Sequence, residues 1–235
     1  MQRLDKILSD AGVASRKELR GLIRTGRVQV NGVPALRPEE KFDEKTAELT
    51  IDGAPVEKLH TVLLMLHKPA GYVTSTDDPG GPSVLELIPE RFRRFGVMPV
   101  GRLDKDTEGL LLLTNDGDLA HRILSPRHGV WKRYYAEHEG TAGPADVRAF
   151  EAGLVLADGL HCLHAKLTPL GPGRSAVEVQ EGKYHQVRRM LASRGMPVTY
   201  LRREAEGRLT LGDLPLGQTK ELNIVEAEQL LLNIL

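Results

Sequence analysis

The central stretch of the chain is Met98-Pro99-Val100-Gly101-Arg102-Leu103-Asp104-Lys105-Asp106-Thr107-Glu108-Gly109-Leu110-Leu111-Leu112-Leu113-Thr114-Asn115-Asp116-Gly117. Its two apolar runs, Val97 to Val100 and Leu110 to Leu113, predict short buried strands. Between the runs lie one Arg, one Lys and three carboxylates, bounded by two glycines. A carboxylate at the end of a buried strand loses several kcal/mol of solvation unless it is paired or takes part in chemistry. A solvated surface hairpin is the alternative, because loops carry charge routinely.

The segment from Gly101 to Gly117 resembles the catalytic motif of the RsuA-type pseudouridine synthases. In that family the Asp of Arg-Leu-Asp is the catalytic residue, so the resemblance implies that role for Asp104. Asp106 and Glu108 are rival acids, and their alternation with Asp104 leaves open a glycoside hydrolase with one acid and one nucleophile. The spacing alone does not fix the carboxyl separation that such a hydrolase needs.

Composition places the chain among ordinary globular proteins. Its 235 residues are 40% hydrophobic and 27% charged, which suits one large or two modest domains. The net charge of zero argues against a uniformly nucleic-acid-seeking surface, but three stretches are locally basic. Lys and Arg outnumber acids by eight to three in residues 1–37, by four to none in 119–135 and by seven to two in 182–208.

Cysteine content and apolar runs favour a cytoplasmic protein with no membrane segment. The single cysteine, Cys162, cannot form an internal disulfide, and no positively charged apolar leader or apolar run of about 18 residues is present. The only tempting metal pattern is His161-Cys162-Leu163-His164, which lacks a second ligand pair at zinc spacing. No metal or cofactor is therefore expected, and the chain is expected to act as a monomer.

The first sixty residues predict a small module of their own. Arg3 to Ala11 has the spacing of an amphipathic helix, and Ser15 with Glu18 forms a capping box that begins a second helix. Asn31-Gly32 then predicts a hairpin turn between short strands.

Arginines recur every four residues on the second helix. Arg16, Arg20 and Arg24 form one basic line that Arg27 extends. A solvated helix face is one explanation, but like charges at this spacing repel, which favours RNA phosphates as partners. The order of residues from 2 to about 50 also resembles the RNA-binding domain named after ribosomal protein S-four, so residues 1–58 are predicted to be such a domain.

The remaining residues, 61–235, are predicted to form a catalytic domain after a linker at Glu57 to Thr61. Expected strands include Val62 to Leu66, Lys132 to Glu137 and Ala176 to Val179, and expected helices include Asp118 to Leu124, Pro144 to Gly153, Gly182 to Gly195 and Glu226 to Leu232. Later strands are expected at Val198 to Leu201 and Arg208 to Leu211. This order predicts an α+β protein: a small N-terminal α/β RNA-binding module followed by a domain with a mixed, mainly antiparallel sheet flanked by helices. A Lys-Pro-x-Gly element at Lys68 is a further match to the family.

The resemblance also implies the other site residues. Tyr134, in Lys132-Arg133-Tyr134, matches a Lys-x-Tyr element whose ring stacks on the target base, with Tyr135 as the neighbouring alternative. Arg188 matches a basic residue that pairs with the catalytic Asp, and an opposite charge would keep that carboxyl ionised. Arg102, Lys132 and Arg189 are expected to contact RNA.

The predicted activity is the isomerisation of a uridine to pseudouridine in ribosomal RNA, either naked or in an assembling particle. Tyr184-His185 resembles the branch of the family that modifies small-subunit (16S) RNA, whereas Asn-Arg is usual in the large-subunit branch. The same chemistry on large-subunit (23S) RNA and a noncatalytic RNA-binding assembly factor are the alternatives.

Overall fold

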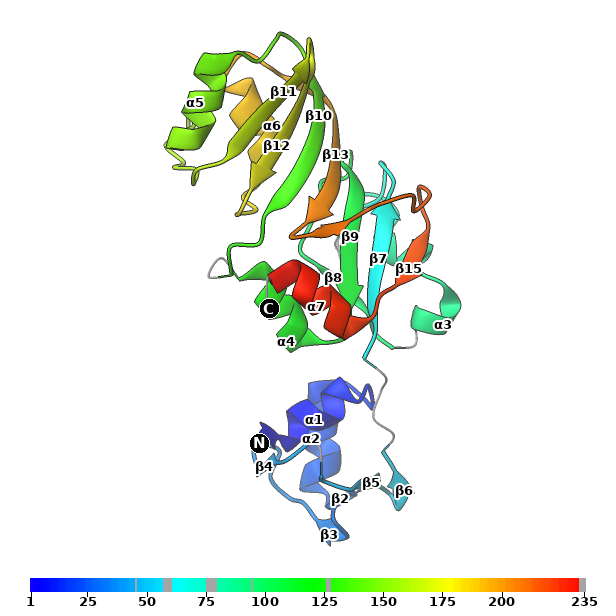
Figure 1. The fold of residues 1–235 in the computed structure, drawn as a ribbon. Helices are drawn as coiled ribbons and strands as arrows, with labels where there is room; N and C mark the ends of the chain where they lie inside the picture. Colours follow the sequence, from blue (N-terminus) through cyan, green and yellow to red (C-terminus); the bar gives the residue numbers. More distant parts are fainter. Residues whose placement is uncertain (45, 57–60, 75–79, 94, 126–127, 233–235) are drawn as a thin grey trace. The chain divides into compact units, whose positions relative to one another are not determined.

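The chain forms two compact units, Met1–Thr61 and Val62–Leu235, in a computed structural model (Figure 1). The structure describes residues 1–44, 46–56, 61–74, 80–93, 95–125 and 128–232. Of the expected linker from Glu57 to Thr61, all but the last residue lies outside the described residues. The sequence Asp77-Asp78-Pro79-Gly80-Gly81-Pro82, whose composition is typical of a turn-rich loop, is likewise described only from residue 80 onward.

The N-terminal unit packs two helices on short strands. In chain order its elements are β1 (Gln2–Arg3), α1 (Leu4–Asp10), α2 (Arg16–Arg24), β2 (Val28–Val30), β3 (Val33–Pro34), β4 (Lys41–Phe42), β5 (Leu49–Ile51) and β6 (Ala54–Pro55). Strands β3, β2, β5 and β6 form one antiparallel sheet and β1 pairs with β4. Both helices and this sheet contribute to one apolar core, which includes Leu8, Leu19 and Val28.

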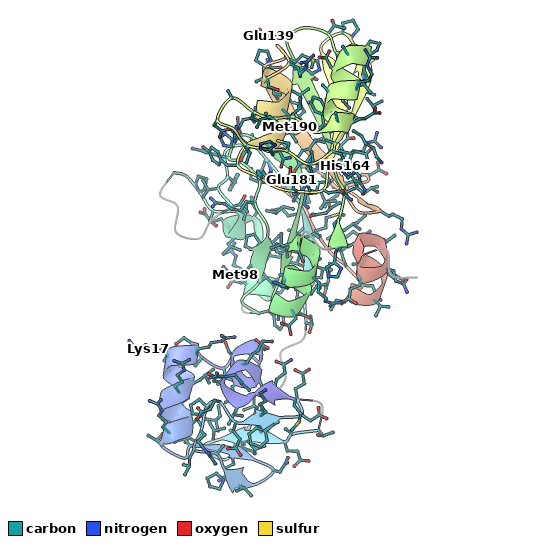
Figure 2. The ribbon with its side chains drawn as sticks, turned by 90° about the vertical axis from the view of Figure 1, so that its left-hand side faces the viewer. Lys17, Met98, Glu139, His164, Glu181 and Met190 are labelled. Atoms are coloured by element: carbon teal, nitrogen blue, oxygen red, sulfur yellow. The ribbon has the colours of Figure 1, made fainter. Side chains whose placement is uncertain are left out.

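Local signals explain where these elements begin and turn. The capping box is confirmed: the Ser15 hydroxyl accepts from the Glu18 N–H, and the Glu18 carboxylate accepts from the Ser15 N–H. Asn31 and Gly32 both have positive φ, as the tight turn between β2 and β3 requires. Lys17 projects into solvent from α2 (Figure 2).

The C-terminal unit is built on one large sheet. Its strands are β7 (Leu63–Lys68), β8 (Met98–Val100), β9 (Glu108–Thr114), β10 (Lys132–His138), β11 (Lys166–Gly171), β12 (Arg174–Val179), β13 (Val198–Glu206), β14 (Leu209–Thr210) and β15 (Thr219–Glu221). Its helices are η1 (Val84–Leu87), α3 (Glu90–Arg93), α4 (Gly117–Leu124), α5 (Pro144–Ala152), α6 (Gln186–Ala192) and α7 (Ile224–Leu232). The two strands expected on either side of the charged loop are β8 and β9.

The sheet has the order β11-β12-β10-β13-β9-β7-β15, with β14 beside β13 and β8 beside β9. Among the described strands every pairing is antiparallel except that of β9 with β13. The predicted α+β class with a mixed, mainly antiparallel sheet is therefore confirmed. One parallel pairing joins two antiparallel halves of the sheet.

Gly109 makes this parallel pairing possible. Its φ is +111°, and a Cβ at this position would lie 2.1 Å from the carbonyl oxygen of Arg203 on β13. Any other residue would separate the two strands, because such a distance is far inside van der Waals contact.

Both faces of the central strands are buried. Alternate residues of β7 and β9 enter different cores: Leu64 and Leu111 pack in the cluster that includes α5 and α6, whereas Leu63 and Leu110 pack in the cluster that includes α4 and α7. Figure 1 shows α5 beside β11 and α4 next to α7, and α6 contacts β13.

Strand β13 corrects one sequence expectation. It extends from Val198 to Glu206, well beyond the expected end at Leu201. The run of charged residues from Arg202 to Glu206 hid the strand, because two of its buried members are ionisable rather than apolar.

Among the described residues, no helix has the length and apolar character needed to cross a bilayer.

Candidate active site

The loop between β8 and β9 carries Asp104, and the segment after β7 holds that loop in place. The Thr74 hydroxyl donates to the Leu103 carbonyl at 2.7 Å, and the Gly71 N–H donates to the Lys105 carbonyl at 2.8 Å. Gly71 belongs to the Lys-Pro-x-Gly element and holds the loop after Asp104, whereas Thr74, which follows the element, holds the loop before Asp104.

Lys68 is the strongest of these attachments. Its ammonium group is fully buried and lies within 2.8–3.1 Å of four carbonyl oxygens, those of Pro69, Asp104, Lys105 and Thr107. Burial lowers the pKa of Lys68 from 10.5 to about 8, although the nearby carboxylates, among them Asp106 and Asp104, favour the charged form. At neutral pH the ammonium form can therefore bind three sites in the loop at once.

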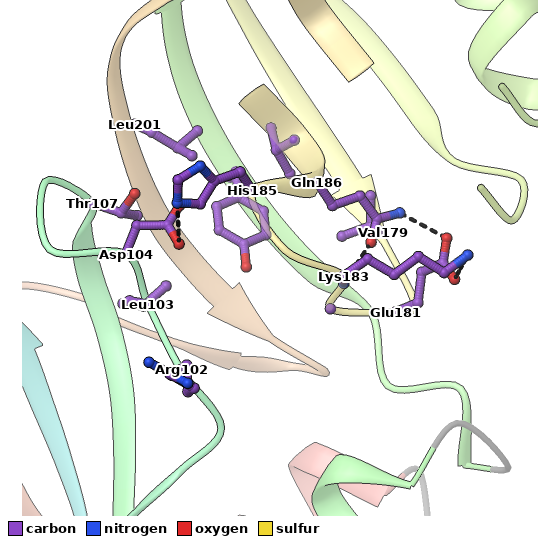
Figure 3. A pocket seen from close by; sticks show the side chains of 13 residues that line it. Arg102, Leu103, Asp104, Thr107, Val179, Glu181, Lys183, His185, Gln186 and Leu201 are labelled. Carbon is purple, nitrogen blue, oxygen red and sulfur yellow. Dashed lines mark hydrogen bonds and ion pairs between the residues drawn. The ribbon is translucent and has the colours of Figure 1, made fainter. Parts of the chain in front are cut away.

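A pocket opens beside Asp104 and is shown in Figure 3. Its volume is about 430 Å³, including the part open to solvent, which is within the usual range for small-ligand sites. Loop, sheet and helix all contribute to its wall, through Arg102, Leu103, Asp104, Thr107, Tyr134, Val179, Glu181, Gly182, Lys183, His185, Gln186, Val187 and Leu201.

Two basic side chains face the Asp104 carboxylate. His185 Nε2 lies 3.5 Å from Asp104 Oδ1, as the dashed line in Figure 3 marks, and Arg188 Nε lies 3.9 Å from Asp104 Oδ2. Arg188 is held closer by Asp106, whose Oδ2 is 2.9 Å from Arg188 Nη2, while its buried Nε has no hydrogen-bond partner. The structure thus places Arg188 beside Asp104, with one donor still unused.

Four carboxylates lie in or near the site, and their surroundings differ. Glu181 also lines the pocket, but it accepts hydrogen bonds from the Leu163 N–H and the Gln186 amide and pairs with Lys183. Asp106 is 69% exposed at its side chain and outside the pocket wall. Glu108 accepts a 2.7 Å hydrogen bond from Tyr200. Asp104 is therefore the pocket carboxylate that is not engaged by hydrogen bonds to its described surroundings.

This arrangement bears on the hydrolase alternative. A glycoside hydrolase needs two carboxyl groups facing each other across one bond. Neither Asp106 nor Glu108 lines the pocket, so the structure does not bring the rival acids together with Asp104 for that purpose.

Of the two adjacent tyrosines on β10, Tyr134 enters the pocket. Tyr134 is only 9% exposed. Burial raises the pKa of its hydroxyl, although the neighbouring Arg203 favours the ionised form. Tyr135 points to the other face of the sheet, where its ring meets Tyr200 at 6.3 Å.

A buried ionic group lies behind Tyr134. Arg203, its partner in the sheet register, donates from Nε to the Leu110 carbonyl at 2.7 Å, and its Nη2 lies 3.6 Å from Glu206. Lys132 Nζ lies 3.8 Å from a carboxylate oxygen of the same residue, Glu206. The side of Tyr134 that faces away from the pocket is therefore next to charged groups as well as apolar side chains.

This network corrects the expectation for Lys132. The residue is only 8% exposed, and burial lowers the pKa of its ammonium group despite Glu206. A side chain enclosed in this way cannot reach an RNA phosphate, so Lys132 is part of the support of the site.

The other residues expected to contact RNA lie in different places. Arg102 is exposed at the pocket wall. Arg189 is half-buried and pairs with Asp158 rather than with a carboxylate of the loop that carries Asp104. In the N-terminal unit Arg16, Arg20 and Arg24 are exposed, and the side chain of Arg27 is half-exposed. Arg20 lies 3.6 Å from Asp5, and Arg27 pairs with Asp52, so two of the four already have an acidic neighbour.

Sequence reasoning assigned no place in the site to Lys68, Arg203 and Glu206, and it used His185 only to choose between branches of the family. A lysine between a strand and a proline could have signalled a buried cation, since β7 is otherwise apolar. Nothing in the spacing of Arg203 or Glu206 indicated burial, because only the pairing of β13 with β10 brings them behind Tyr134. Within the described part of the chain, no three His, Cys, Asp or Glu side chains come together as a metal ion would require.

Comparisons with known proteins cover both units. A family model described as RNA pseudouridylate synthase matches residues 62–193, and the S4 domain model matches residues 2–46. The crystal structure of a pseudouridylate synthase is similar with a TM-score of 0.70 and 29% identity, over 98% of this chain and 100% of the other.

Several relatives match over nearly their whole length. YtzG of Bacillus subtilis, an uncharacterised RNA pseudouridine synthase, is 39% identical over 98% of this chain and 98% of its own. A similar protein of Mycobacterium leprae is 41% identical over 97% of this chain and 91% of its own. Ribosomal large subunit pseudouridine synthase B of Bacillus subtilis is 35% identical over 98% of this chain and 95% of its own.

Proposed function

Because this chain belongs to the RNA pseudouridylate synthase family, and is an isomerase acting on RNA, we propose that it converts one specific uridine of ribosomal RNA to pseudouridine at the Asp104 pocket. The observation that carries this proposal is the position of Asp104 in the pocket, facing Arg188 and His185 with no hydrogen bond to its described surroundings. The resemblance to the RsuA-type enzymes, drawn from the same loop, is confirmed by the family match.

The reaction requires four events at one base. The bond from uracil N1 to the ribose carbon breaks, the base turns over, and a bond forms from uracil C5 to that carbon, after which C5 loses its proton. A carboxylate suffices as the covalent or electrostatic partner of this exchange. We assign that role to Asp104, and to Arg188 the role of a positively charged partner whose Nε lies 3.9 Å from the Asp104 carboxylate.

Tyr134 is proposed as the aromatic partner of the target base. A uridine that enters the pocket must first leave its stack, at a cost of a few kcal/mol that interactions in the pocket offset. Tyr134 lies in the wall next to Asp104, so its ring can stack on the flat base while its hydroxyl remains protonated, in keeping with its raised pKa.

RNA outside the pocket is proposed to be bound by basic side chains. Arg102 is exposed beside Asp104, and four arginines of the N-terminal unit, Arg16, Arg20, Arg24 and Arg27, form a separate basic face. Such side chains bind phosphates, which position the RNA without reading its sequence. Arg189 is proposed as a further RNA contact only if binding releases it from Asp158.

Small-subunit (16S) RNA is the proposed substrate, as free RNA or in an assembling particle. The support is Tyr184-His185, since the small-subunit branch has Tyr-His at these two positions. Large-subunit (23S) RNA is the second candidate, favoured by the similarity to ribosomal large subunit pseudouridine synthase B. A noncatalytic assembly factor would have no need to gather Asp104, Tyr134 and Arg188 in one place.

Two measurements test these proposals in turn. RNA carrying tritium at C5 of uracil should release the label into water during incubation with the protein, because the new carbon–carbon bond expels it. Carbodiimide modification and primer extension should then locate one pseudouridine in 16S RNA that is missing from cells without the protein. Loss of a 23S site with all 16S sites intact would overturn the small-subunit assignment and leave the chemistry intact.

A further inference from the structure

Tyr184 is an exposed aromatic residue at the edge of the candidate active site. The residue is 76% exposed, yet its ring stacks on His185, with ring centroids 3.8 Å apart and planes inclined by 17°. One face of the phenol ring is covered by the imidazole in this way. Among the described residues no other ring and no cation stacks on the Tyr184 ring, so its second face is open.

The stack is continuous with the catalytic centre. His185 lines the pocket and its Nε2 lies 3.5 Å from Asp104, while Tyr184 stacks on the face of the His185 ring and is not part of the pocket wall. The open face of Tyr184 therefore lies next to a residue of the pocket, outside the space that the target base would occupy.

The backbone around the two rings is fixed. His185 has φ +49°, a conformation that few residues other than glycine adopt and that persists only where the surroundings impose it. Those surroundings are provided by Gln186, which is buried and accepts from the Lys183 N–H at 3.0 Å. The Gln186 amide nitrogen in turn donates to Glu181 and contacts the sulfur of Met190, both labelled in Figure 2.

A rigid aromatic face has a particular use for an enzyme that extrudes a base. Removal of one nucleotide from a stack leaves the adjacent base without a partner on that side, and an aromatic side chain can take the place of that partner. Little side-chain entropy is lost on binding when the ring is already held. Stacking on an aromatic ring also tolerates any base, because every base has a π-face.

We propose that the open face of Tyr184, supported by His185, is a binding subsite for the nucleobase next to the target uridine. This inference rests on the proposed function and extends it from the flipped base to its neighbour. The subsite would bind a purine or pyrimidine ring through stacking, while His185 links its position to that of Asp104.

A double-mutant cycle between protein and RNA tests the subsite. The probe is a fluorescently labelled RNA stem-loop containing the uridine located by pseudouridine mapping, together with two versions that lack the base on its 5′ or its 3′ side. Dissociation constants are measured by anisotropy for the wild type, Tyr184→Ala and Tyr184→Phe. Tyr135→Ala, on the opposite face of the sheet, is the control for loss of a partly exposed tyrosine.

Tyr184→Ala should weaken binding of the intact stem-loop by about 5- to 100-fold, the range for one base stacked on an aromatic ring. Tyr184→Phe should stay within about twofold of the wild type, because it retains the ring. One of the two abasic RNAs should bind the wild type more weakly by a similar factor and should show no further loss with Tyr184→Ala.

Fully additive effects at both flanking positions would overturn the subsite, as would an unchanged affinity of Tyr184→Ala. Tritium release by the wild type is measured on the same stem-loop. Release with additive binding effects means that the subsite alone is wrong, whereas no release means that the proposed function has failed even if the rings bind RNA. Thermal unfolding of both Tyr184 variants should match the wild type, because the replaced ring is mostly exposed.

Discussion

At the scale of single residues, the four carboxylates in and near the site differ in the partners that surround them. Glu181 and Glu108 are occupied by hydrogen bonds, and Asp106 holds the outer end of Arg188. Asp104 faces two basic groups at 3.5 and 3.9 Å without a hydrogen bond to either. A charge that is attracted but not engaged remains free to act on a substrate.

Asp104→Asn should reduce tritium release to background while RNA affinity stays within a few-fold, because the change removes the charge and retains the shape. Asp106→Asn should lower the rate by about fivefold or less, since the Asp106 side chain is largely exposed and ion pairs with a solvated partner contribute about 1 kcal/mol or less. Rates and affinities of both variants and of Glu108→Gln are compared. Equal losses in all three would contradict a single catalytic carboxylate and support a hydrolase-like pair.

Lys68 predicts a pH dependence of the rate. With a pKa of about 8, the ammonium group loses a proton above that pH, and the loop carrying Asp104 loses one of its hydrogen-bond donors. The rate of tritium release should therefore fall above about pH 8 in the wild type. In Lys68→Arg the fall should move beyond the measurable range, because a guanidinium keeps its charge, while Lys105→Arg in the same loop should leave the profile unchanged.

The same lowered pKa predicts that stability rises, rather than falls, as the pH increases. Between pH 8 and 10.5 the unfolded chain binds the Lys68 proton and the folded chain does not, so the contribution of Lys68 to the free energy of unfolding rises with pH in this window. Denaturant unfolding at several pH values measures it. A stability contribution that instead fell across the window would show that the four carbonyl oxygens raise this pKa.

At the scale of elements, the seam between β9 and β13 determines the site. Strand β9 follows the Asp104 loop directly, and β13 carries Arg203 behind Tyr134. Their parallel pairing places the two halves of the pocket wall next to each other. The seam depends on Gly109, where the backbone of the two strands is closer than any side chain permits.

Gly109→Ala should lower the free energy of unfolding by about 4 kcal/mol or more, a size reserved for strained or overpacked positions. Two costs combine: the positive φ and the overlap of the new methyl group with the Arg203 carbonyl. Gly117→Ala is the matched control, because nothing lies within 4 Å of its Cβ position at the start of α4. Urea unfolding of both variants makes the comparison, and equal effects would contradict the close approach.

The arginine face of α2 is expected to act through phosphates. Replacing Arg16, Arg20 and Arg24 with alanine should weaken binding to all RNAs alike and lower the slope of log affinity against log salt by about 0.7 to 0.9 for each phosphate that an arginine no longer neutralises. Arg20 should contribute less than Arg24 does, because it has Asp5 as a neighbour. Salt titrations of each single variant and the triple variant measure this, and an unchanged slope would mean that the face is merely solvated.

At the scale of the whole molecule, the candidate active site belongs to the C-terminal unit and the arginine face of α2 belongs to the N-terminal unit. Each core consists of residues of its own unit, and the pocket is lined only by residues of the C-terminal unit. We therefore expect that the N-terminal unit can be removed without loss of the catalytic pocket.

A fragment of residues 62–235 should fold and retain the maximal rate of tritium release within a few-fold. The RNA concentration for half-maximal rate should rise by about tenfold or more, because the N-terminal arginines are no longer present to bind phosphates. Circular dichroism and single-turnover kinetics of the fragment test both parts. A fragment that folds but lacks the maximal rate would show that the N-terminal unit contributes to the chemistry.

The sequence by itself determined most local features and the identity of the reaction. Hydrophobic periodicity located the longer helices and the central strands of the large sheet, but not the short helices η1 and α3 or strands such as β5, β11 and β15. The capping box and the Asn31-Gly32 turn were confirmed, and the motif around Asp104 identified the family. These signals are readable because they arise between residues close together in the chain, where spacing alone fixes geometry. A domain boundary near residue 60 was expected on the same basis.

Only the tertiary structure showed what surrounds the site. It placed Lys68 beneath the Asp104 loop, His185 beside the carboxylate, and Lys132 in the core rather than on an RNA surface. It also revealed that Arg203 and Glu206 are buried in β13, although the strand expected from the sequence ended at Leu201. These positions depend on pairing between strands far apart in sequence, and the burial of a charged side chain is stable only when such distant partners meet it.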